Sequence, residues 1–406
     1  MKNKTESFFY IIIPALFTFP IFKESISSLL LILLILNTII YTISSKKFKF
    51  KTRKVLLFTI PFWILILFTH IDFSNPKTLI PINNGLFFLL FPITFSYIPK
   101  IHFSKEKIIF YLEIVKNTCF IIAISYIVGF LYKYNFSDFF VFKYEIPKFR
   151  DFVYNEVSFF KIHPTYFTAI VVLSTAFSFE KILKQKKYLE LIYLAVFVII
   201  TFMLLVKINI IMIILLLFYM MLFRSPYTTK QKISASFFLI LTVIIFSFSI
   251  PGVKNRFKEI IDSYNTAPNG LAYDSTNIRV SIYKCCYNLA QDHYLFGVGF
   301  ENLGEELKTC FKNNYGSDFY KNETYLSHNY YLYIFLSSGV FGLILYLFYV
   351  FKIIVSIIRQ DVFILSLGMI NIFILCFTED FFYRHYGLFY FSLLFFTYYN
   401  SESNTN

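Results

Sequence analysis

Charged residues are scarce in this chain of 406 residues. Asp, Glu, Lys and Arg together make up 15% of it, whereas soluble domains carry about 25% charged residues. Hydrophobic residues make up 57%, and Phe alone occupies 56 positions. A soluble fold could not bury so much apolar surface. The composition therefore excludes a soluble globular protein and predicts an all-α integral membrane protein.

The chain also lacks acidic residues to balance its basic ones, and its formal net charge is +14. A strongly basic balance can indicate nucleic-acid binding. Here, however, the basic residues stand in short clusters between apolar runs, which is the pattern that sets membrane topology. We therefore expect membrane lipid, and no nucleic acid, as a partner.

Cysteine is rare, and no C-x-x-C pair with metal-ligand spacing occurs among the five cysteines. We expect neither a metal nor a cofactor. Cys119 and Cys376 lie in apolar runs and are predicted to be packing residues. Cys285, Cys286 and Cys310 share one polar segment, where one disulfide could form in an oxidising compartment.

Long apolar runs dominate the rest of the chain, and a helix needs about 20 apolar residues to cross a bilayer. The first run lacks a small-residue cleavage site, so we expect a retained helix and not a cleaved signal. The pair of runs around Lys207 could form a tight hairpin or one broken helix. Twelve spans are predicted, at roughly 8–22, 28–44, 55–71, 79–98, 108–131, 164–180, 189–206, 208–223, 233–251, 329–350, 362–378 and 383–398.

Charge bias predicts the orientation of these spans. With the N-terminus in the cytoplasm, the cytoplasmic segments hold 20 Lys and Arg, and the four short outer loops hold one each. This is a strong positive-inside signal, from which long loops are exempt. Both termini are then cytoplasmic. The expected divisions are spans at 1–131, an outer loop at 132–163, spans at 164–251, a large outer loop at 252–328, spans at 329–398 and a tail at 399–406.

The large loop holds an amphipathic pattern. Ile278, Ile282, Cys285 and Leu289 recur at helical spacing, which predicts a helix on the outer membrane surface. Arg279 stands in its first turn beside this apolar stripe. An arginine there could simply reach lipid phosphates. Alternatively, it could bind the phosphates of a substrate in a bidentate manner.

His328 and Asn329 stand directly before the next apolar run. A histidine at a helix start can be a plain interfacial residue, or it can act as a general base near neutral pH. Lys207, between two apolar runs, could snorkel to the interface or neutralise an anion.

Further charges are predicted to form pairs. Glu379 and Arg384 lie between the last two runs and could form an internal ion pair or an ordinary loop pair. Glu113 and Lys116, about one turn apart, are predicted to form a structural pair.

Taken together, the order of these features resembles the O-antigen ligase and O-antigen polymerase superfamily. The resemblance covers roughly residues 190–395. It consists of the arginine helix, then "DHYLFGVGFENL", then "SHNYYLYIFLSSGVFGLILYLF", then "EDFFYRHYGLFYF". Members of that superfamily are bacterial inner-membrane proteins with about twelve spans and a large late periplasmic loop. The resemblance thus implies a GT-C-like membrane fold with a periplasmic active site.

The resemblance implies a metal-independent glycosyltransferase of surface polysaccharide or lipopolysaccharide biosynthesis. The donor would be a glycan on undecaprenyl diphosphate, and the acceptor another glycan or lipid A-core. Arg279 matches the arginine taken to bind the diphosphate, and His328 matches the histidine taken to activate the acceptor hydroxyl. Glu379 matches an acidic residue before the last span. Lys207 stands where many members carry Ser-Arg, a departure that keeps the charge and loses the planar fork.

The sequence leaves several activities open. A ligase would move finished glycan to its acceptor, whereas a polymerase would join repeat units on the lipid carrier. A transporter or flippase of lipid-linked sugars would show inverted repeats and broken helices with polar residues at mid-membrane. A membrane scaffold would leave the placement of Arg279, His328 and Glu379 without a purpose. The ligase activity is the primary expectation, with Asn329 and Arg384 as supporting residues.

Overall fold

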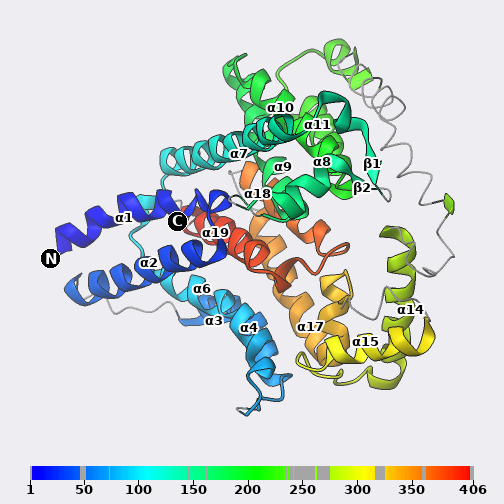
Figure 1. Ribbon diagram of the computed structural model, residues 1–406. Coiled ribbons are helices and arrows are strands. Elements are labelled where there is room, and N and C mark those ends of the chain that lie inside the picture. The colour runs from blue at the N-terminus through cyan, green and yellow to red at the C-terminus, as the bar shows by residue number, and fades with distance from the viewer. Residues whose placement is uncertain are drawn as a thin grey trace. The chain divides into compact units, whose positions relative to one another are not determined.

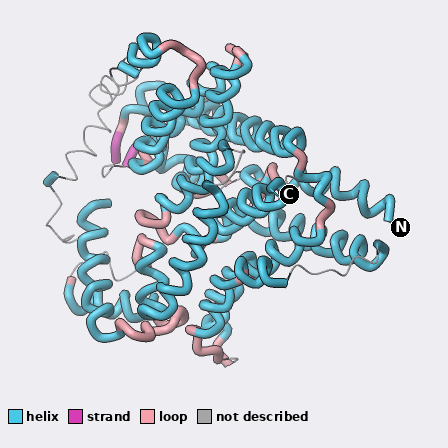
Figure 2. Tube along the Cα trace, turned by 180° about the vertical axis from the view of Figure 1, so that it is seen from behind, coloured by secondary structure: helices cyan, strands magenta, loops and turns pink. Residues whose placement is uncertain are grey.

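The described chain is almost entirely helical, apart from the short strands β1 and β2 (magenta in Figure 2). A computed structural model provides the coordinates. It describes residues 2–45, 52–72, 74–143, 146–158, 160, 162–234, 236, 237, 241, 261, 262, 275–315, 325–358 and 363–402.

The helices of the first third are α1 (Lys2–Leu16), η1 (Phe19–Ile21), α2 (Glu24–Ser45), α3 (Thr52–Phe58), α4 (Ile60–Leu67), η2 (Pro76–Leu79), α5 (Ile80–Gly85), α6 (Phe87–Tyr97), η3 (Lys100–Phe103) and α7 (Lys105–Lys133). The middle third contains η4 (Phe136–Phe140), β1 (Phe142–Lys143), β2 (Ile146–Pro147), α8 (Lys148–Asp151), η5 (Phe152–Glu156), α9 (Pro164–Gln185), α10 (Glu190–Leu204), α11 (Lys207–Tyr219) and η6 (Met220–Arg224). The last third contains α14 (Ser275–His293), α15 (Leu303–Asn314), α17 (Tyr330–Ile358), α18 (Phe363–Leu375), η7 (Phe381–Tyr383) and α19 (His385–Glu402).

Six helical stretches in the described part of the chain are long and apolar enough to cross a membrane. They coincide with six of the twelve predicted spans. Together with the composition, they identify an all-α membrane protein. The six are Glu24–Ser45, Pro76–Tyr97, Lys105–Lys133, Pro164–Gln185, Lys207–Arg224 and Tyr330–Ile357.

The other predicted spans are shorter or interrupted. α10 and α18 are apolar but shorter than a full span. The predicted span 55–71 contains two helices, α3 and α4, because Pro61 follows a break at Thr59. The predicted spans at the two ends of the chain overlap with α1 and α19. Most of the predicted span 233–251 lies outside the described residues. Twelve spans and their orientation therefore stay a prediction.

By packing, the chain divides into two compact units. The first unit comprises residues 1–13, 31–105 and 262–406, and the second comprises residues 14–30 and 106–261.

Phenylalanine rings hold the helices of the first unit together. α6 packs against α19, and both helices present rings along the contact. Phe91 and Phe389 lie 5.4 Å apart in a T-shaped arrangement, and Phe95 lies 6.1 Å from Phe396. Edge-to-face ring pairs add about 0.5–1.5 kcal/mol to the burial of their area. The abundance of Phe in the sequence is thus used for packing between helices.

A cluster of four charges joins three helices of the second unit. Lys116 of α7 contacts Glu113 at 2.8 Å and Glu190 of α10 at 2.7 Å. Lys181 of α9 contacts Glu190 at 2.7 Å and also pairs with Glu113. The predicted pair of Glu113 and Lys116 is confirmed, and the structure extends it to a cluster. Because both lysines and Glu190 are buried, each charge depends on its partners.

α10 and α11 are separate helices joined by a turn at Leu205, which has a left-handed φ of 48°. Both pack against α9, so the hairpin alternative for this region is the one observed. Lys207 is the first residue of α11 and is half-buried.

The predicted amphipathic helix of the large loop is α14. It packs against α15 and α17 (Figure 1). Ile278 and Ile282 are buried in that packing. Cys285 forms a disulfide with Cys310 of α15, whereas Cys286 is a buried free thiol. The apolar stripe is therefore covered by protein. Its predicted place at the membrane surface stays a prediction.

α17 contains a break. Gly339 has φ 64° and ψ −167°, which no helix allows. The preceding "FGVGF" turn fills the break, since the Val298 and Gly299 N–H groups donate to the carbonyls of Leu336 (2.9 Å) and Ser337 (3.0 Å). A Cβ at Gly339 would lie 2.0 Å from the carbonyl oxygen of Leu295. Glycine is thus required by both conformation and space.

Candidate functional site

Arg279, His328 and Glu379 meet in the first unit. The carboxylate of Glu379 lies between the other two side chains. One oxygen, Oε1, is 3.6 Å from Nη2 of Arg279, and the other, Oε2, is 3.3 Å from Nδ1 of His328. Three predicted site residues, from α14, the start of α17 and the segment after α18, therefore form one cluster.

A second carboxylate fixes the backbone around His328. Asp380 accepts hydrogen bonds from the His328 N–H (2.9 Å), the Asn329 N–H (3.2 Å) and the Ser327 hydroxyl (2.6 Å). These bonds hold His328 at a left-handed φ of 47°. Such a backbone conformation is uncommon outside glycine and persists where surrounding contacts impose it.

Asn329 caps the helix that follows. Its side-chain oxygen accepts hydrogen bonds from the N–H groups of Tyr331 and Leu332, both at 3.1 Å. Asparagine is a favoured N-cap because it satisfies N–H groups that lack a helical partner. These contacts of Asn329 position the start of α17. The supporting role predicted for Asn329 in the reaction stays a prediction.

The surroundings of Asp380 affect its protonation. Packing that excludes water raises the pKa of the Asp380 carboxyl, and the Ser327 hydroxyl and nearby His328 oppose this rise. Burial thus favours the neutral form of this carboxyl, and the contacts with Ser327 and His328 favour the charged form.

Arg279 retains donors for a ligand. Its Nη2 contacts the Thr378 carbonyl at 3.4 Å, and this bond and the contact with Glu379 are both long. Its Nε is buried, and no hydrogen-bond partner for it lies in the described part of the chain. The side chain is 32% exposed. Because Nε is buried, a ligand would meet the exposed part of the guanidinium, and guanidinium groups are suited to bind phosphate oxygens.

The contact between His328 and Glu379 orients the imidazole. If Nδ1 carries the proton and donates it to the carboxylate, Nε2 carries the lone pair. Nε2 can then accept a proton from a hydroxyl group. The carboxylate also stabilises the imidazolium that results. The cluster therefore offers a base beside an anion-binding arginine.

Two other predicted residues lie elsewhere. Arg384 is exposed, and among the ion pairs of the described residues Glu379 joins Arg279 and His328 instead of Arg384. Lys207 lies in the second unit, at the start of α11. The roles predicted for both stay predictions.

Sequence reasoning missed Asp380 and Ser327. A signal was present, because an aspartate between two apolar runs carries a high energetic cost and needs partners. Ser327 gave no such signal. Among the described residues, no group of three His, Cys, Asp or Glu side chains is placed to hold a metal ion.

Comparison with known proteins gives one family. Residues 189–347 match the family model described as O-antigen ligase. The match contains Arg279 and His328, and it ends before Glu379 and Asp380. No curated protein matches the chain. The family match confirms the resemblance to the O-antigen ligase and polymerase superfamily.

Proposed function

We propose that this chain, which resembles O-antigen ligases and polymerases over residues 189–347, is a membrane glycosyltransferase. It moves a glycan from undecaprenyl diphosphate to an acceptor hydroxyl in surface polysaccharide biosynthesis. We favour a ligase, whose acceptor is lipid A-core or another glycan, at the periplasmic face of the inner membrane. A repeat-unit polymerase of the same superfamily is the alternative.

The carboxylate of Glu379, which joins Arg279 and His328, is the observation that carries this proposal. Arg279 comes from α14, far from His328 in the sequence. Transfer from a sugar diphosphate needs an anion-binding group and a base at one place. The cluster supplies both.

In the proposed reaction, the acceptor hydroxyl attacks the anomeric carbon of the donor glycan. Nε2 of His328 takes the hydroxyl proton as the new glycosidic bond forms. The bond between that carbon and the diphosphate oxygen breaks, and its electron pair leaves with the diphosphate. Arg279 stabilises the departing anion. Glu379 keeps His328 oriented throughout.

Lys207 is the predicted second cation for the diphosphate. Its ammonium supplies a point charge and lacks the bidentate fork of an arginine. On this proposal Lys207→Ala reduces transfer, and Lys207→Arg restores it, because the charge is the required property.

A transporter of lipid-linked sugars is the second alternative. The break of α17 at Gly339 favours it, because discontinuous helices are typical of transporter sites. In such sites the freed backbone groups bind substrate or ions. Here the Leu336 and Ser337 carbonyls accept bonds from the turn at 298–299, and the Val340 N–H donates to Tyr294. The break is thus occupied by protein, which supports the transferase.

The test is glycan display in a deletion strain that carries the wild-type chain, His328→Ala or Arg279→Ala at matched membrane levels. Thr309→Ala and Lys312→Ala serve as controls, since both side chains are exposed outside the cluster. Lipid-linked intermediates and surface polysaccharide are resolved by gel. We expect each site variant to match the deletion strain, with a loss of about 10²–10⁴-fold, and each control to match wild type.

The intermediates distinguish the activities. Long chains held on the carrier in the deletion strain indicate a ligase, and single repeat units indicate a polymerase. Lipid-linked glycan confined to the cytoplasmic leaflet indicates a flippase. Normal display by both site variants would contradict the catalytic assignment.

A further inference from the structure

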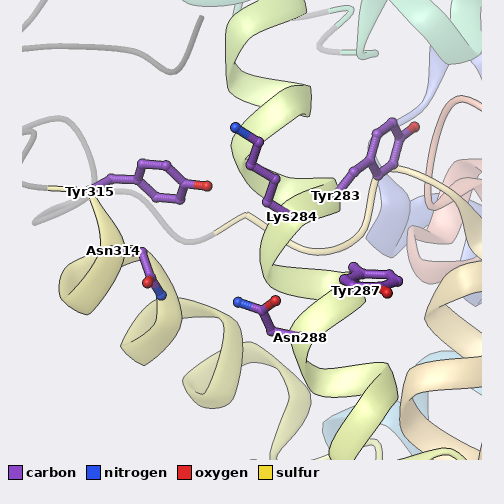
Figure 3. A pocket seen from close by; sticks show the side chains of 6 residues that line it. All are labelled: Tyr283, Lys284, Tyr287, Asn288, Asn314 and Tyr315. Carbon is purple, nitrogen blue, oxygen red and sulfur yellow. The ribbon is translucent and has the colours of Figure 1, made fainter. Parts of the chain in front are cut away.

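A cavity of about 520 Å³ lies between α14 and α15. Figure 3 shows Lys284 and Asn288 on successive turns of α14, with Asn314 and Tyr315 facing them from the end of α15. Tyr283 and Tyr287 line the cavity from α14 as well. Its volume falls within the range of about 300–1,000 Å³ that small-ligand sites occupy.

The residues that line the cavity combine aromatic rings with polar side chains. Tyr287 is 64% exposed, and Lys284 and Asn288 are exposed without a polar partner among the described residues. Tyrosine offers a rigid, amphipathic face, and amides both donate and accept hydrogen bonds. A sugar ring has the complementary surface, with apolar C–H faces and a rim of hydroxyls. An acyl chain would leave the amides and the ammonium unpaired.

A disulfide and a hydrogen bond fix the walls of the cavity. The disulfide between Cys285 and Cys310 joins its two walls. The Asn314 amide donates to the Cys310 carbonyl at 2.9 Å. A preformed site loses less free energy on binding than one that must be ordered.

The cavity and the candidate active site share one helix, α14, which carries Arg279 and four of the residues that line the cavity. Tyr283 lies one helical turn after Arg279, and Tyr287 lies two turns after it, about 12 Å along the axis. Burial raises the pKa of Tyr283, and the nearby Arg279 guanidinium opposes this rise. Tyr283 thus borders both the arginine and the cavity. A glycan whose diphosphate lies at Arg279 would have this cavity within about 12 Å along α14.

We propose that the cavity between α14 and α15 is a sugar-binding subsite that holds part of the glycan during transfer. The proposal rests on the glycosyltransferase function above and adds where the sugar chain lies. The Asn288 amide pairs with sugar hydroxyls, Tyr287 packs on a ring face, and Lys284 pairs with a hydroxyl or an acidic group of the sugar.

The test measures binding to the full chain in lipid nanodiscs. The probe is oligosaccharide released by mild acid from the surface polysaccharide of the source strain, titrated by saturation-transfer NMR. The variants are Tyr287→Ala and Asn288→Ala. Thr309→Ala is the matched control, since Thr309 is exposed on α15 and does not line the cavity. Equal melting temperatures establish that the variants fold.

We expect wild type and Thr309→Ala to bind the oligosaccharide equally, and Tyr287→Ala and Asn288→Ala to bind about tenfold more weakly or worse. The subsite is overturned if wild type shows no saturable binding or if both variants bind as wild type does. The subsite is also overturned if anionic lipid vesicles displace the bound probe as effectively as competing oligosaccharide does.

Competition identifies the source of the bound sugar. Displacement by the lipid-linked donor makes the cavity a donor subsite, and displacement by the glycan acceptor makes it an acceptor subsite. The transfer assay with His328→Ala separates this proposal from the proposed function. Normal transfer by His328→Ala, with weakened probe binding by Tyr287→Ala, would contradict the proposed catalytic function and still support the sugar-binding subsite.

Discussion

Glu379 contacts Nδ1 of His328 with one carboxylate oxygen and the Arg279 guanidinium with the other. One side chain thereby sets the distance between a base and a cation that lie 49 positions apart in the sequence. Because the carboxylate contacts Nδ1, the proposed reaction uses the other ring nitrogen, Nε2. This relationship makes Glu379 the residue whose charge is most directly testable.

Glu379→Gln keeps the shape of the side chain and removes its charge. We expect transfer to fall about ten- to a thousandfold, because a neutral amide neither fixes the imidazole tautomer nor stabilises the imidazolium. The pH profile of the remaining activity should change as well. Glu305→Gln, at an exposed position of α15, is the control. Rates and profile equal to wild type would show that Glu379 has no part in positioning His328.

The break in α17 gives a prediction on stability. Gly339→Ala would put a Cβ 2.0 Å from the Leu295 carbonyl oxygen at a backbone φ of 64°. We expect it to lower the free energy of unfolding by about 2–5 kcal/mol. Gly304→Ala, where nothing lies within 4 Å of the added Cβ, should be neutral or slightly stabilising. Thermal melting in detergent measures both. Equal melting of the two variants would mean that the turn at 297–299 does not occupy the break.

The disulfide gives a prediction on thiol counts. Denatured protein, alkylated without reduction, should add three maleimide labels, at Cys119, Cys286 and Cys376. After reduction it should add five, because Cys285 and Cys310 become available. Cys310→Ser should leave Cys285 labelled before reduction and lower stability by about 3 kcal/mol. Five labels on unreduced protein would contradict the bond between α14 and α15.

The charge cluster of the second unit predicts a contrast between two lysines of α9. Lys181→Met leaves Glu190 with one partner fewer at a buried site, and we expect a loss of about 3–5 kcal/mol. Lys184, which pairs with Glu180 at the surface, is 50% exposed. Lys184→Met should change stability by less than about 1 kcal/mol. Melting temperatures test the contrast, and equal losses would show that the cluster does not hold the three helices.

Asp380 predicts a pH dependence. Its pKa is raised in the folded protein above 3.8, so the folded chain binds this proton more tightly than the unfolded chain does. Stability contributed by Asp380 is then present at low pH and is lost as pH rises through the raised pKa. The melting temperature of wild type minus that of Asp380→Asn should therefore fall from about pH 4 upward. A constant or rising difference would overturn the assignment.

Local periodicity allowed much of the helical structure to be predicted. The spacing of Ile278 and Ile282 predicted α14, and both residues are buried on its packed face. Apolar length alone predicted the six helical stretches of the described chain that are long and apolar enough to cross a membrane. Long apolar helices can be predicted from sequence because many consecutive residues share the same hydrophobic character. α3 and α4 were predicted as one span, because the effect of a proline on a continuous apolar run depends on its tertiary surroundings.

Three of the predicted site residues lie together in the structure, and the roles predicted for them stay predictions. Arg279, His328 and Glu379 were singled out, but Glu379 was expected to pair with Arg384, five positions away. The sequence makes near neighbours easy to consider and gives no distance between α14 and the segment after α18. The same limit applied to the cysteines. Cys285 and Cys286 are both buried on α14, and only the packing of α15 decides that Cys285 forms the disulfide.

The two acidic residues that hold His328 come about 50 positions after it. During synthesis, therefore, the ribosome completes α17 before the carboxylates that orient the imidazole exist. A nascent chain inserted as far as α17 has the histidine and the arginine helix and lacks the part that brings them together. On the proposed function, activity is therefore acquired only when the segment that carries Glu379 and Asp380 is in place, and a chain released before that point would be inactive.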